Sequence, residues 1–404
     1  MPLAFDPFDP AFQADPYPWY ERLRTEDPVH LLDVHLPGLE LPGLWLLTRY
    51  DDVVAVLRDD RFSADKPLLR LLDFSPALRV MGSTMLTADP PAHTRLRTLV
   101  GNAFTPRMIE ALRPRVQAIV DELLDAVLPA GTIDLVPDFA TPLPVIVIAE
   151  LLGIPAADRA RFKRWSDAVV VLTDGNRLLT GLPQAEQAVA ELGEYLSVVF
   201  ADRRQRPRED LVSALVAARD EGQGLTDDQL LGTCILLLVA GNETTTNLIG
   251  TGVRTLLRHP AQADLVREHA CVARTAVEEL LRYDSPVQLT SRVARVDVRI
   301  RGRVIRAGQE VDVCLAAANR DPAQFPRADE LDVTRADNPH VAFGHGRHFC
   351  LGAALARLEA QIAIPTLLRR LPDLRLETEA PAWRDGFVVR GLATLPLSFR
   401  RVAA

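Results

Sequence analysis

The segment from Thr226 to Pro260 constrains the fold more than any other part of this 404-residue chain. Thr226-Asp227-Asp228-Gln229 has the pattern of a capping box, which starts a helix, and Pro260 ends one. At a rise of 1.5 Å per residue, the segment between them predicts a helix of about 45–50 Å. Because a helix of that length crosses the whole molecule, the other elements have to pack around it.

The middle of this predicted helix contains residues that a buried helix normally avoids. The apolar run Ile235–Val239 leads directly into the sequence AGNETTT of residues 240–246. Glycine inside a helix costs about 1 kcal/mol relative to alanine, and a buried acid costs more unless it finds a partner. Such exceptions commonly mark a functional site. The alternative is a helix that reaches the surface at its middle.

A second stretch, FGHGRHFCLG from Phe343 onward, puts one cysteine where a glycine-containing loop runs into a helix. The residues after Cys350, Ala353–Glu359, are strong helix formers. The N–H groups and the dipole at a helix start favour the thiolate form of a cysteine. Gly344 and Gly346 let the backbone approach a flat, bulky group closely. These are the properties that a haem iron requires of a cysteine ligand.

Two other interpretations compete for this stretch. Gly-x-Gly near a helix is also typical of a phosphate loop, but no strand pattern leads into it and no Gly-Lys-Ser/Thr follows. The close spacing of His340, His345, His348 and Cys350 is also compatible with zinc, although structural zinc sites usually take their ligands from two separated segments. The zinc interpretation corresponds to a helical interaction protein without a redox role.

The cysteine stretch resembles the haem-binding loop of the cytochrome P450 monooxygenases, Phe-x-x-Gly-x-x-x-Cys-x-Gly. Phe343, Gly346, Cys350 and Gly352 occupy its four fixed positions. The resemblance implies heme b (iron protoporphyrin IX) with the Cys350 thiolate as axial ligand of the metal. It further implies that the cofactor-binding residues of this stretch are Phe343, Gly344, His348 and Gly352.

The central helix is similar to the same family, whose motif Ala/Gly-Gly-x-Asp/Glu-Thr is matched by Ala240, Gly241, Glu243 and Thr244. The resemblance implies that Ala240 and Gly241 lie against the cofactor, where Gly241 opens a groove for dioxygen. Thr244 and Glu243 are then the catalytic residues that deliver protons. Glu243 stands where the best-known members have Asp, and this lengthens its reach by one methylene.

The resemblance also implies residues that hold the haem propionates. His93 and Arg97 are four residues apart in a helix that begins near Ala92, so they share a face, which alone would suggest an exposed surface. The family uses this His-x-x-x-Arg pair for a haem propionate. Arg292 follows a predicted strand, residues 287–291, and is placed for a propionate as well.

Glu279 and Arg282 are three residues apart, a spacing that alone suggests an ordinary surface salt bridge of little value. They match the family's Glu-x-x-Arg pair, which implies a buried structural pair that fixes the segment before the cysteine. A third partner is expected from the following irregular region, with Arg327 or Arg335 as candidates.

The amino-acid composition indicates how large a core the chain can form and whether a linker divides it. With 48% apolar residues the chain can bury a large core, and its 30 prolines are scattered rather than gathered into a linker. The expected fold class is mainly α: the cytochrome P450 fold, a large helical domain with a long central helix and a minor β-rich portion. Residues 1–404 are expected to form one domain. Its expected β-containing parts are about 29–50, 287–315 and 385–400, and its expected helical core is about 92–285 and 350–370.

Charge and cysteine usage limit location and partners. A net charge of −8 gives no reason to expect nucleic-acid binding. Cys234, Cys271, Cys314 and Cys350 lack paired spacing, which favours a reduced, cytoplasmic protein. The N-terminus lacks a signal-peptide pattern, and no apolar run is long enough to span a membrane. We expect a cytoplasmic monomer that binds neither membrane nor nucleic acid.

The expected reaction inserts one atom of O2 into a C–H bond of a mostly hydrophobic small molecule, by hydroxylation or alternatively epoxidation. Ferredoxin and ferredoxin reductase are the implied electron donors, and secondary metabolism is the implied setting. A peroxide-driven oxygenase, a reductase or an isomerase is the alternative, against which Glu243 and Thr244 argue. Residues 63–88, the connector 173–182 and a hairpin turn at 391–394 are expected near the substrate. The residues expected to line its pocket are Leu86, Ala240, Val287, Leu289, Leu392 and Ala393.

Overall fold

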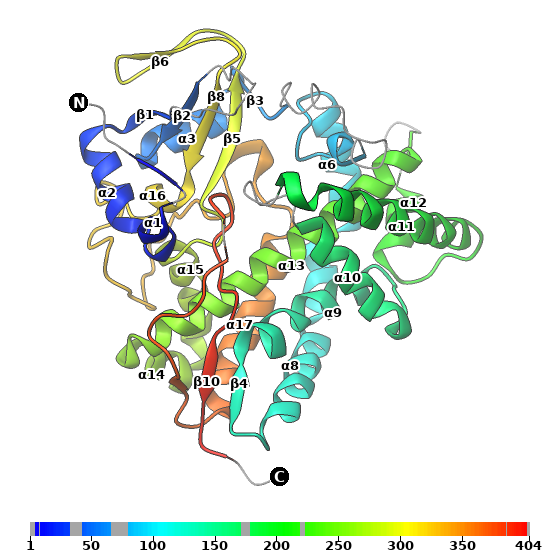
Figure 1. Ribbon diagram of the computed structural model, residues 1–404. Coiled ribbons are helices and arrows are strands. Elements are labelled where there is room, and N and C mark those ends of the chain that lie inside the picture. The colour runs from blue at the N-terminus through cyan, green and yellow to red at the C-terminus, as the bar shows by residue number, and fades with distance from the viewer. Residues whose placement is uncertain are drawn as a thin grey trace.

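The long helix α13 (Asp227–Leu257) runs through the middle of the molecule (Figure 1). The computed structural model describes residues 5–7, 9–32, 43–65, 80–170, 178–218, 223–384 and 386–401. The predicted capping box is present: Thr226 Oγ1 accepts from the Gln229 N–H, and Gln229 Oε1 accepts from the Thr226 N–H, both at 3.2 Å. Pro260 begins the next helix, α14, so α13 ends where the sequence predicts.

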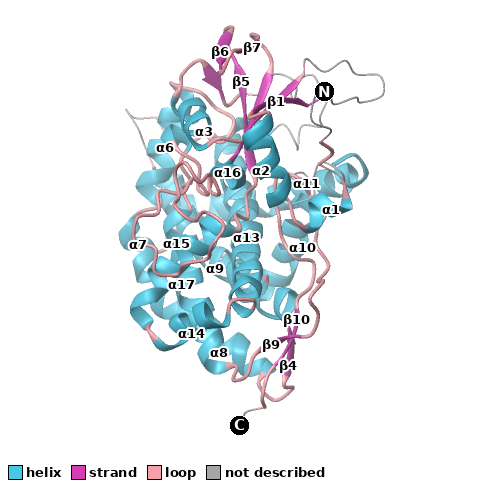
Figure 2. Cartoon of the chain, turned by 90° about the vertical axis from the view of Figure 1, so that its left-hand side faces the viewer, coloured by secondary structure: helices cyan, strands magenta, loops and turns pink. Residues whose placement is uncertain are grey.

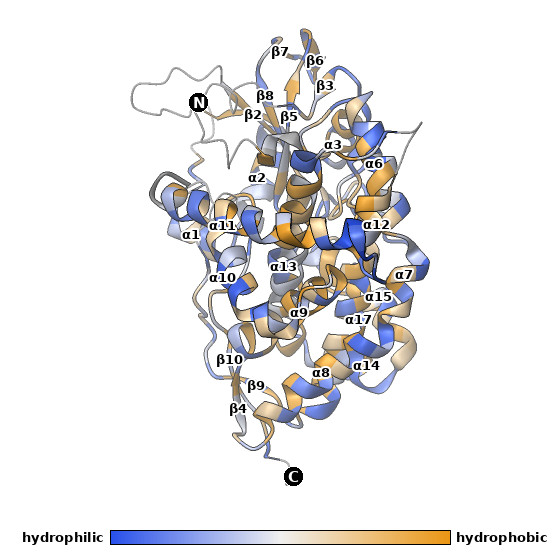
Figure 3. Ribbon diagram, turned by 90° about the vertical axis from the view of Figure 1, so that its right-hand side faces the viewer, coloured by the Kyte–Doolittle hydropathy of each residue, from blue (hydrophilic) through white to orange (hydrophobic). Residues whose placement is uncertain are grey.

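Helices surround α13 on several sides, with α9, α10, α15 and α17 packed directly against it. In Figure 3 the hydrophobic residues gather along α9, whose side chains are largely buried. The helices in order are α1 (Pro10–Ala14), α2 (Tyr17–Glu26), α3 (Tyr50–Arg58), α6 (Ala92–Ala103), α7 (Pro106–Ala111), α8 (Arg113–Val127), α9 (Pro142–Leu151), α10 (Arg159–Val170), α11 (Leu178–Gln205), α12 (Leu211–Ala217), α13, α14 (Pro260–Glu268), α15 (Ala273–Tyr283), α16 (Leu315–Ala318) and α17 (Ala353–Arg370).

The main sheet lies at one end of the molecule and a smaller sheet at the other, with the helices between them (Figure 2). The main sheet has the order β1-β2-β8-β5-β3, with β2 and β8 parallel and the other neighbours antiparallel. The smaller sheet has the order β4-β10-β9, and β6 and β7 form a hairpin. The strands are β1 (Val29–Leu32), β2 (Leu44–Leu47), β3 (Phe62–Ser63), β4 (Thr132–Asp134), β5 (Leu289–Ala294), β6 (Val298–Ile300), β7 (Arg303–Ile305), β8 (Glu310–Cys314), β9 (Arg375–Leu376) and β10 (Pro396–Ser398).

The C-terminal hairpin differs from the prediction, which put its turn at residues 391–394. Trp383 pairs with Leu392, and the Arg384 N–H donates to the Gly391 carbonyl at 2.9 Å. The arms are therefore 382–384 and 391–393, and the turn lies between them. The predicted turn is wrong because residues 391–393 already pair with the preceding arm, while the residues just after them enter β10.

Parts of the predicted substrate-facing segments, residues 66–79 and 171–177, lie outside the described residues. The division of residues 1–404 into one domain stays a prediction. None of the helices in the described ranges combines the length and the hydrophobicity needed to cross a bilayer.

Candidate active site

The loop before α17 is fixed by its glycines. Gly344 and Gly346 have φ of +70° and +71°, a conformation that side chains with a Cβ adopt reluctantly. A Cβ on Gly346 would also lie 2.7 Å from the carbonyl oxygen of Leu57, at the end of α3. The Cys350 N–H donates to the Phe343 carbonyl at 2.9 Å, which closes the loop on itself. The loop is thus held against α3 and presents Cys350 at a defined position.

The side chain of Cys350 is accessible, although α17 behind it is largely buried. Although the residue is exposed, protein groups around the sulfur partly desolvate it and raise the pKa of the Cys350 thiol, and the N–H groups of Gly352 and Ala353 and the cation of Arg97 oppose that rise. The N–H groups predicted to favour the thiolate are therefore present. In this protein environment their effect is smaller than that of desolvation, so the pKa of Cys350 stays above its ordinary value.

Four predicted cofactor-binding side chains from three separate segments gather beside the cysteine loop: His93 and Arg97 from α6, Arg292 from β5, and His348 from the loop itself. The rings of His93 and His348 lie 4.2 Å apart between centroids, and the Nε2 atom of each is buried without a hydrogen-bond partner. The structure thus brings this predicted set together.

The charges in this group have few protein partners. Arg292 donates to the Ser291 carbonyl at 2.7 Å, and within the described ranges Arg97 makes no hydrogen bond or ion pair. Burial and then the Arg292 cation lower the pKa of His348 to about 3, and burial and then Arg97 lower the pKa of His93. Two neutral imidazoles and two guanidiniums therefore offer N–H donors without a carboxylate.

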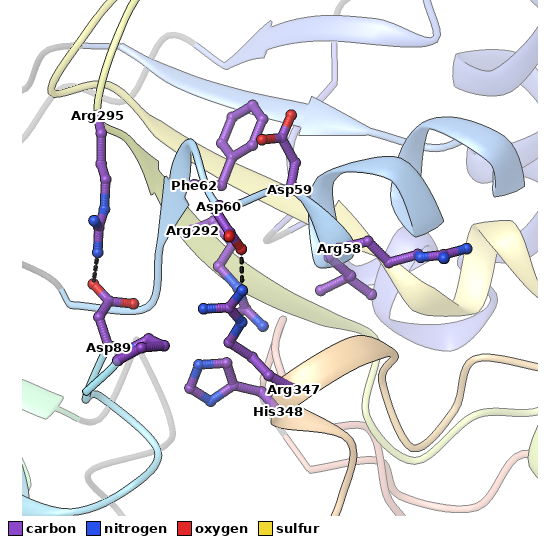
Figure 4. A pocket seen from close by; sticks show the side chains of 11 residues that line it. Arg58, Asp59, Asp60, Phe62, Asp89, Arg292, Arg295, Arg347 and His348 are labelled. Atoms are coloured by element: carbon purple, nitrogen blue, oxygen red, sulfur yellow. Dashed lines mark hydrogen bonds and ion pairs between the residues drawn. The ribbon is translucent and has the colours of Figure 1, made fainter. Parts of the chain in front are cut away.

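A surface pocket of about 160 Å³ opens next to this group and shares Arg292 and His348 with it (Figure 4). Two ion pairs stand at its edge: Arg295 with Asp89 at 2.6 Å, and Arg347 with Asp60. The three acids that line the pocket, Asp59, Asp60 and Asp89, are therefore already engaged with other arginines. This leaves Arg97 and Arg292 free to bind an anion.

The middle of α13 is open on one side. Ala240 is exposed, and Gly241, Glu243 and Thr244 are half-buried, while most of the helix on either side is buried. Thr244 Oγ1 donates to the Ala240 carbonyl one turn earlier, at 2.8 Å. Asn242, Thr245 and Thr246 on the other faces of the helix are buried, so α13 is open on this one side at its middle.

Glu243 has a partner that the sequence analysis missed. Its Oε1 accepts from Arg384 Nη1 at 2.8 Å, and Arg384 comes from the C-terminal hairpin. No local pattern in the sequence connects the two residues, since Arg384 stands alone in an irregular segment. Only the fold brings them together.

The buried pair Glu279–Arg282 is fully inaccessible, and both nitrogen–oxygen contacts measure 2.8 Å. Arg335 Nε is the third partner, 3.1 Å from Glu279 Oε2, and Asn338 Nδ2 donates to the same oxygen at 3.1 Å. The other candidate, Arg327, is wrong: its exposed side chain pairs with Glu330. The pair ties α15 to the irregular segment that leads to Cys350.

The zinc interpretation is contradicted within the described residues, where no group of three or more potential ligands is gathered. His340 binds Glu278 instead, with Nε2 3.0 Å from Oε2. Although burial acts to raise it, hydrogen bonds from His340 and Arg357 bring the pKa of Glu278 down to about 2. His340 therefore belongs to an ion-pair network rather than to a metal site.

The residues expected to line the substrate pocket differ in how far they are exposed to solvent. Leu86 is 58% exposed, Ala393 is exposed and Val287 is half-buried. Leu289 and Leu392 are buried at 2% and 1%, and the Leu392 side chain lies over Gly250 of α13. Leu392 thus packs into the core because the hairpin arm that carries it lies directly on α13.

A comparison with known families matches residues 178–381 to the family Cytochrome P450. The polyketide biosynthesis cytochrome P450 PksS of Bacillus subtilis is 41% identical over 99% of this chain and 99% of its own length. The chain belongs to the cytochrome P450 family. The cytochrome P450 monooxygenase PikC of Streptomyces venezuelae is 47% identical over 96% of this chain and 92% of its own.

Solved cytochrome P450 structures share the fold. The PksS structure matches with a TM-score of 0.91 at 40% identity, covering 98% of this chain and 100% of its own. P450BioI, solved with an acyl carrier protein carrying hexadec-9Z-enoic acid, matches with a TM-score of 0.90 at 40% identity, covering 96% and 99%. As a cytochrome P450, the protein is an oxidoreductase of the monooxygenase class, and the family implies heme b with a cysteine thiolate ligand.

The residues present fit this cofactor. Haem b carries two carboxylates, and the N–H donors of His93, His348, Arg97 and Arg292 lack carboxylate partners of their own. The accessible sulfur of Cys350 is a suitable thiolate donor for iron. Charge-assisted hydrogen bonds to carboxylates are also the stronger kind, so this group is chemically matched to propionates.

Proposed function

We propose that Cys350 is the haem ligand and that the protein hydroxylates a mostly hydrophobic small molecule, with epoxidation as the alternative outcome. The observation that supports this best is the accessible sulfur at the start of α17 beside four N–H donor side chains that lack a carboxylate partner. When bound, the haem supplies the activation of O2 and the transfer of one oxygen atom to a C–H bond.

The chain's own residues would position the cofactor and move protons. His93, Arg97, Arg292 and His348 would hold the propionates, while Gly344 and Gly346 keep the loop close to the ring. Ala240 and Gly241, on the open side of α13, would leave space above it. Thr244 and Glu243 would pass protons from solvent to the reacting oxygen, because a hydroxyl and a half-buried carboxylate lie next to each other there.

The substrate is proposed to be hydrophobic and long or large. The exposed apolar side chain of Leu86 lies in the segment that precedes α6. The relatives support the same class: one is described as a polyketide biosynthesis enzyme, and another was solved with a fatty acyl chain on a carrier protein. Hexadec-9Z-enoic acid is therefore a suitable first probe, and a secondary-metabolism setting is proposed with it.

The family implies redox partners, and we propose ferredoxin with its reductase. The four cysteines lie far apart in sequence, so the chain itself offers no ligand set for an iron–sulfur cluster. Three arginines that the sequence offers for docking an acidic ferredoxin already have partners within the protein: Arg347 with Asp60, Arg357 with Glu278, and Arg95 with Gln229. A monomeric, cytoplasmic protein stays a prediction.

The test is the spectrum of the haem-loaded protein, reduced and exposed to carbon monoxide. The wild type should give the strongly red-shifted band of a thiolate-ligated haem, and Cys350→Ser should abolish it. Cys271→Ser is the matched control, because Cys271 is the other exposed cysteine among the described residues, and it should leave the band unchanged. A thiolate band that survives in Cys350→Ser would overturn the ligand assignment.

The substrate proposal is tested separately by titrating hexadec-9Z-enoic acid into the ferric protein. Displacement of a water ligand shifts the spin state, which a Soret difference spectrum records. The absence of a shift from this acid and from a panel of hydrophobic polyketides would overturn the proposed substrate class.

A further inference from the structure

Glu243 is held at the side of α13 that faces the C-terminal hairpin. Its Oε1 accepts from Arg384 Nη1 at 2.8 Å, while no described residue donates to its Oε2. The Glu243 side chain is 13% exposed and that of Arg384 is 35% exposed. Arg384 therefore connects a mostly buried acid to the surface of the molecule, and one carboxylate oxygen remains available for another donor.

Arg384 stands on a fixed element. Its N–H donates to the Gly391 carbonyl at 2.9 Å, and the neighbouring Trp383 pairs with Leu392. The hairpin lies on α13 so closely that a Cβ on Gly391 would overlap the side-chain amide of Asn247. In Figure 1 the same hairpin, drawn in red, runs beside α13. The backbone position of Arg384 is thus fixed by the pairing of the two hairpin arms and by their packing on α13.

Asn247 lies one helical turn after both Glu243 and Thr244 on α13. It follows Glu243 by four residues and Thr244 by three, so it shares a helix face with each of them. The side chain is 2% exposed, and neither its Oδ1 nor its Nδ2 has a hydrogen-bond partner. A buried amide in this state costs about 1–3 kcal/mol, and ordered water commonly satisfies such groups. Asn247 therefore offers an unpartnered donor and an unpartnered acceptor at a helix position that follows both Glu243 and Thr244 by one turn.

We propose that Arg384 is a positioning residue that holds the Glu243 carboxylate on the side of α13 where it can pass protons to the neighbouring Thr244. This inference rests on the proton-delivery role proposed above for Glu243 and Thr244. Protons then enter where Arg384 meets solvent, pass to the carboxylate, and go on to the Thr244 hydroxyl. Arg384 acts through Glu243, and its loss leaves the acid without its anchor.

The first measurement follows the fate of electrons without added substrate, with NADPH and a surrogate ferredoxin and its reductase. Two electrons and two protons convert O2 to hydrogen peroxide, whereas four of each convert it to two waters. Slower proton delivery therefore raises the hydrogen peroxide formed per NADPH consumed. Arg384→Gln should raise this ratio only about twofold, because a partly exposed ion pair is weak. Arg384→Lys keeps the positive charge and should restore the wild-type ratio.

The controls separate this effect from a general loss of structure. Arg400→Gln removes an arginine from an exposed pair with Asp373 and should leave the ratio at its wild-type value. Thr244→Ala should raise the ratio further than Arg384→Gln does. If Thr244→Ala raises it and Arg384→Gln does not, the role of Arg384 is overturned while the proposed function stands.

The second measurement is independent of turnover. The thermal unfolding of Arg384→Gln, Glu243→Gln and the double variant forms a mutant cycle on the haem-loaded protein. The double variant should lose less in Tm than the two single variants lose together, since either substitution alone already breaks the pair. Strictly additive losses would contradict the contact. A wild type without the thiolate band would instead overturn the proposed function.

Discussion

The Nε2 atoms of His93 and His348 are both buried without a partner, and the two rings lie 4.2 Å apart between centroids. Unsatisfied buried donors are costly, and nearby Arg97 adds a cation that no described residue pairs. An anion bound at this place would satisfy all three side chains at once. The free energy that the haem-free protein loses by burying these unpartnered groups is therefore regained when a group with carboxylates binds.

The first prediction concerns Arg97→Leu, which removes a donor that the protein itself does not use. Haem should leave the variant about 10- to 100-fold faster than the wild type, because a hydrogen bond to a charged group contributes about 1.5–3 kcal/mol. The stability of the haem-free protein should be unchanged or higher. Transfer of haem to apomyoglobin measures the first quantity and urea unfolding the second. Equal transfer rates would remove Arg97 from the cofactor site.

The second prediction concerns Glu279→Gln, which breaks a fully buried pair. Removing one partner leaves Arg282 uncompensated and should cost about 3–5 kcal/mol of unfolding free energy. Glu330→Gln is the matched control, because its side chain pairs with Arg327 at an exposed position and should change stability by less than about 1 kcal/mol. Urea unfolding of both variants tests this, and similar losses would contradict a special role for the buried pair.

The third prediction concerns Thr244→Ala. If its hydroxyl passes protons, the proton-dependent step should slow about a hundredfold, and most NADPH electrons should then appear as hydrogen peroxide. Thr251→Ala removes a hydroxyl from the same helix that makes the same kind of bond, to the Asn247 carbonyl at 2.7 Å. This control should keep the wild-type ratio of peroxide to NADPH. An unchanged ratio in Thr244→Ala would exclude the relay.

The fourth prediction concerns pH. Glu359 on α17 is 1% exposed with Oε2 unpartnered, and burial raises its pKa from 4.5 to about 8. Between these values the folded protein holds a proton that the unfolded chain releases, so stability should fall as pH rises through this window. Glu359→Gln should flatten that fall and be the more stable protein at pH values of about 8 and above. Tm measured across the window checks this, with exposed Glu268→Gln as control; parallel wild-type and Glu359→Gln curves would contradict it.

Much of the fold and site follows from local sequence patterns. The capping box at Thr226 and the proline at 260 delimit α13, because both act through backbone groups within one turn. The helix after Cys350 follows from its strong helix formers. The convergence of His93, Arg97, Arg292 and His348 followed from a resemblance, since nothing local connects three separate segments.

What the sequence did not predict depends on long-range packing. Arg335 and Arg327 are equivalent candidates by composition, and only the path of the irregular segment places Arg335 at Glu279. Arg384 has no local signal at all, and its role depends on where the hairpin lies on α13. The hairpin turn was misplaced for the same reason: residues 391–393 pair with an arm that carries no clear strand pattern.

The parallel pairing of β2 with β8 has a consequence for synthesis of the chain. Leu44 of β2 pairs with Glu310 of β8, and Leu47 pairs with Val313. In the main sheet, β1 and β2 can therefore pair only with each other until β8 has left the ribosome, when nearly four-fifths of the chain has been made. Loop closure over such a distance is slow, whereas helical contacts such as those between α10 and α11 are local. Until β8 is available, the β1–β2 hairpin therefore has an open edge at β2, which is the kind of edge that pairs readily with other chains.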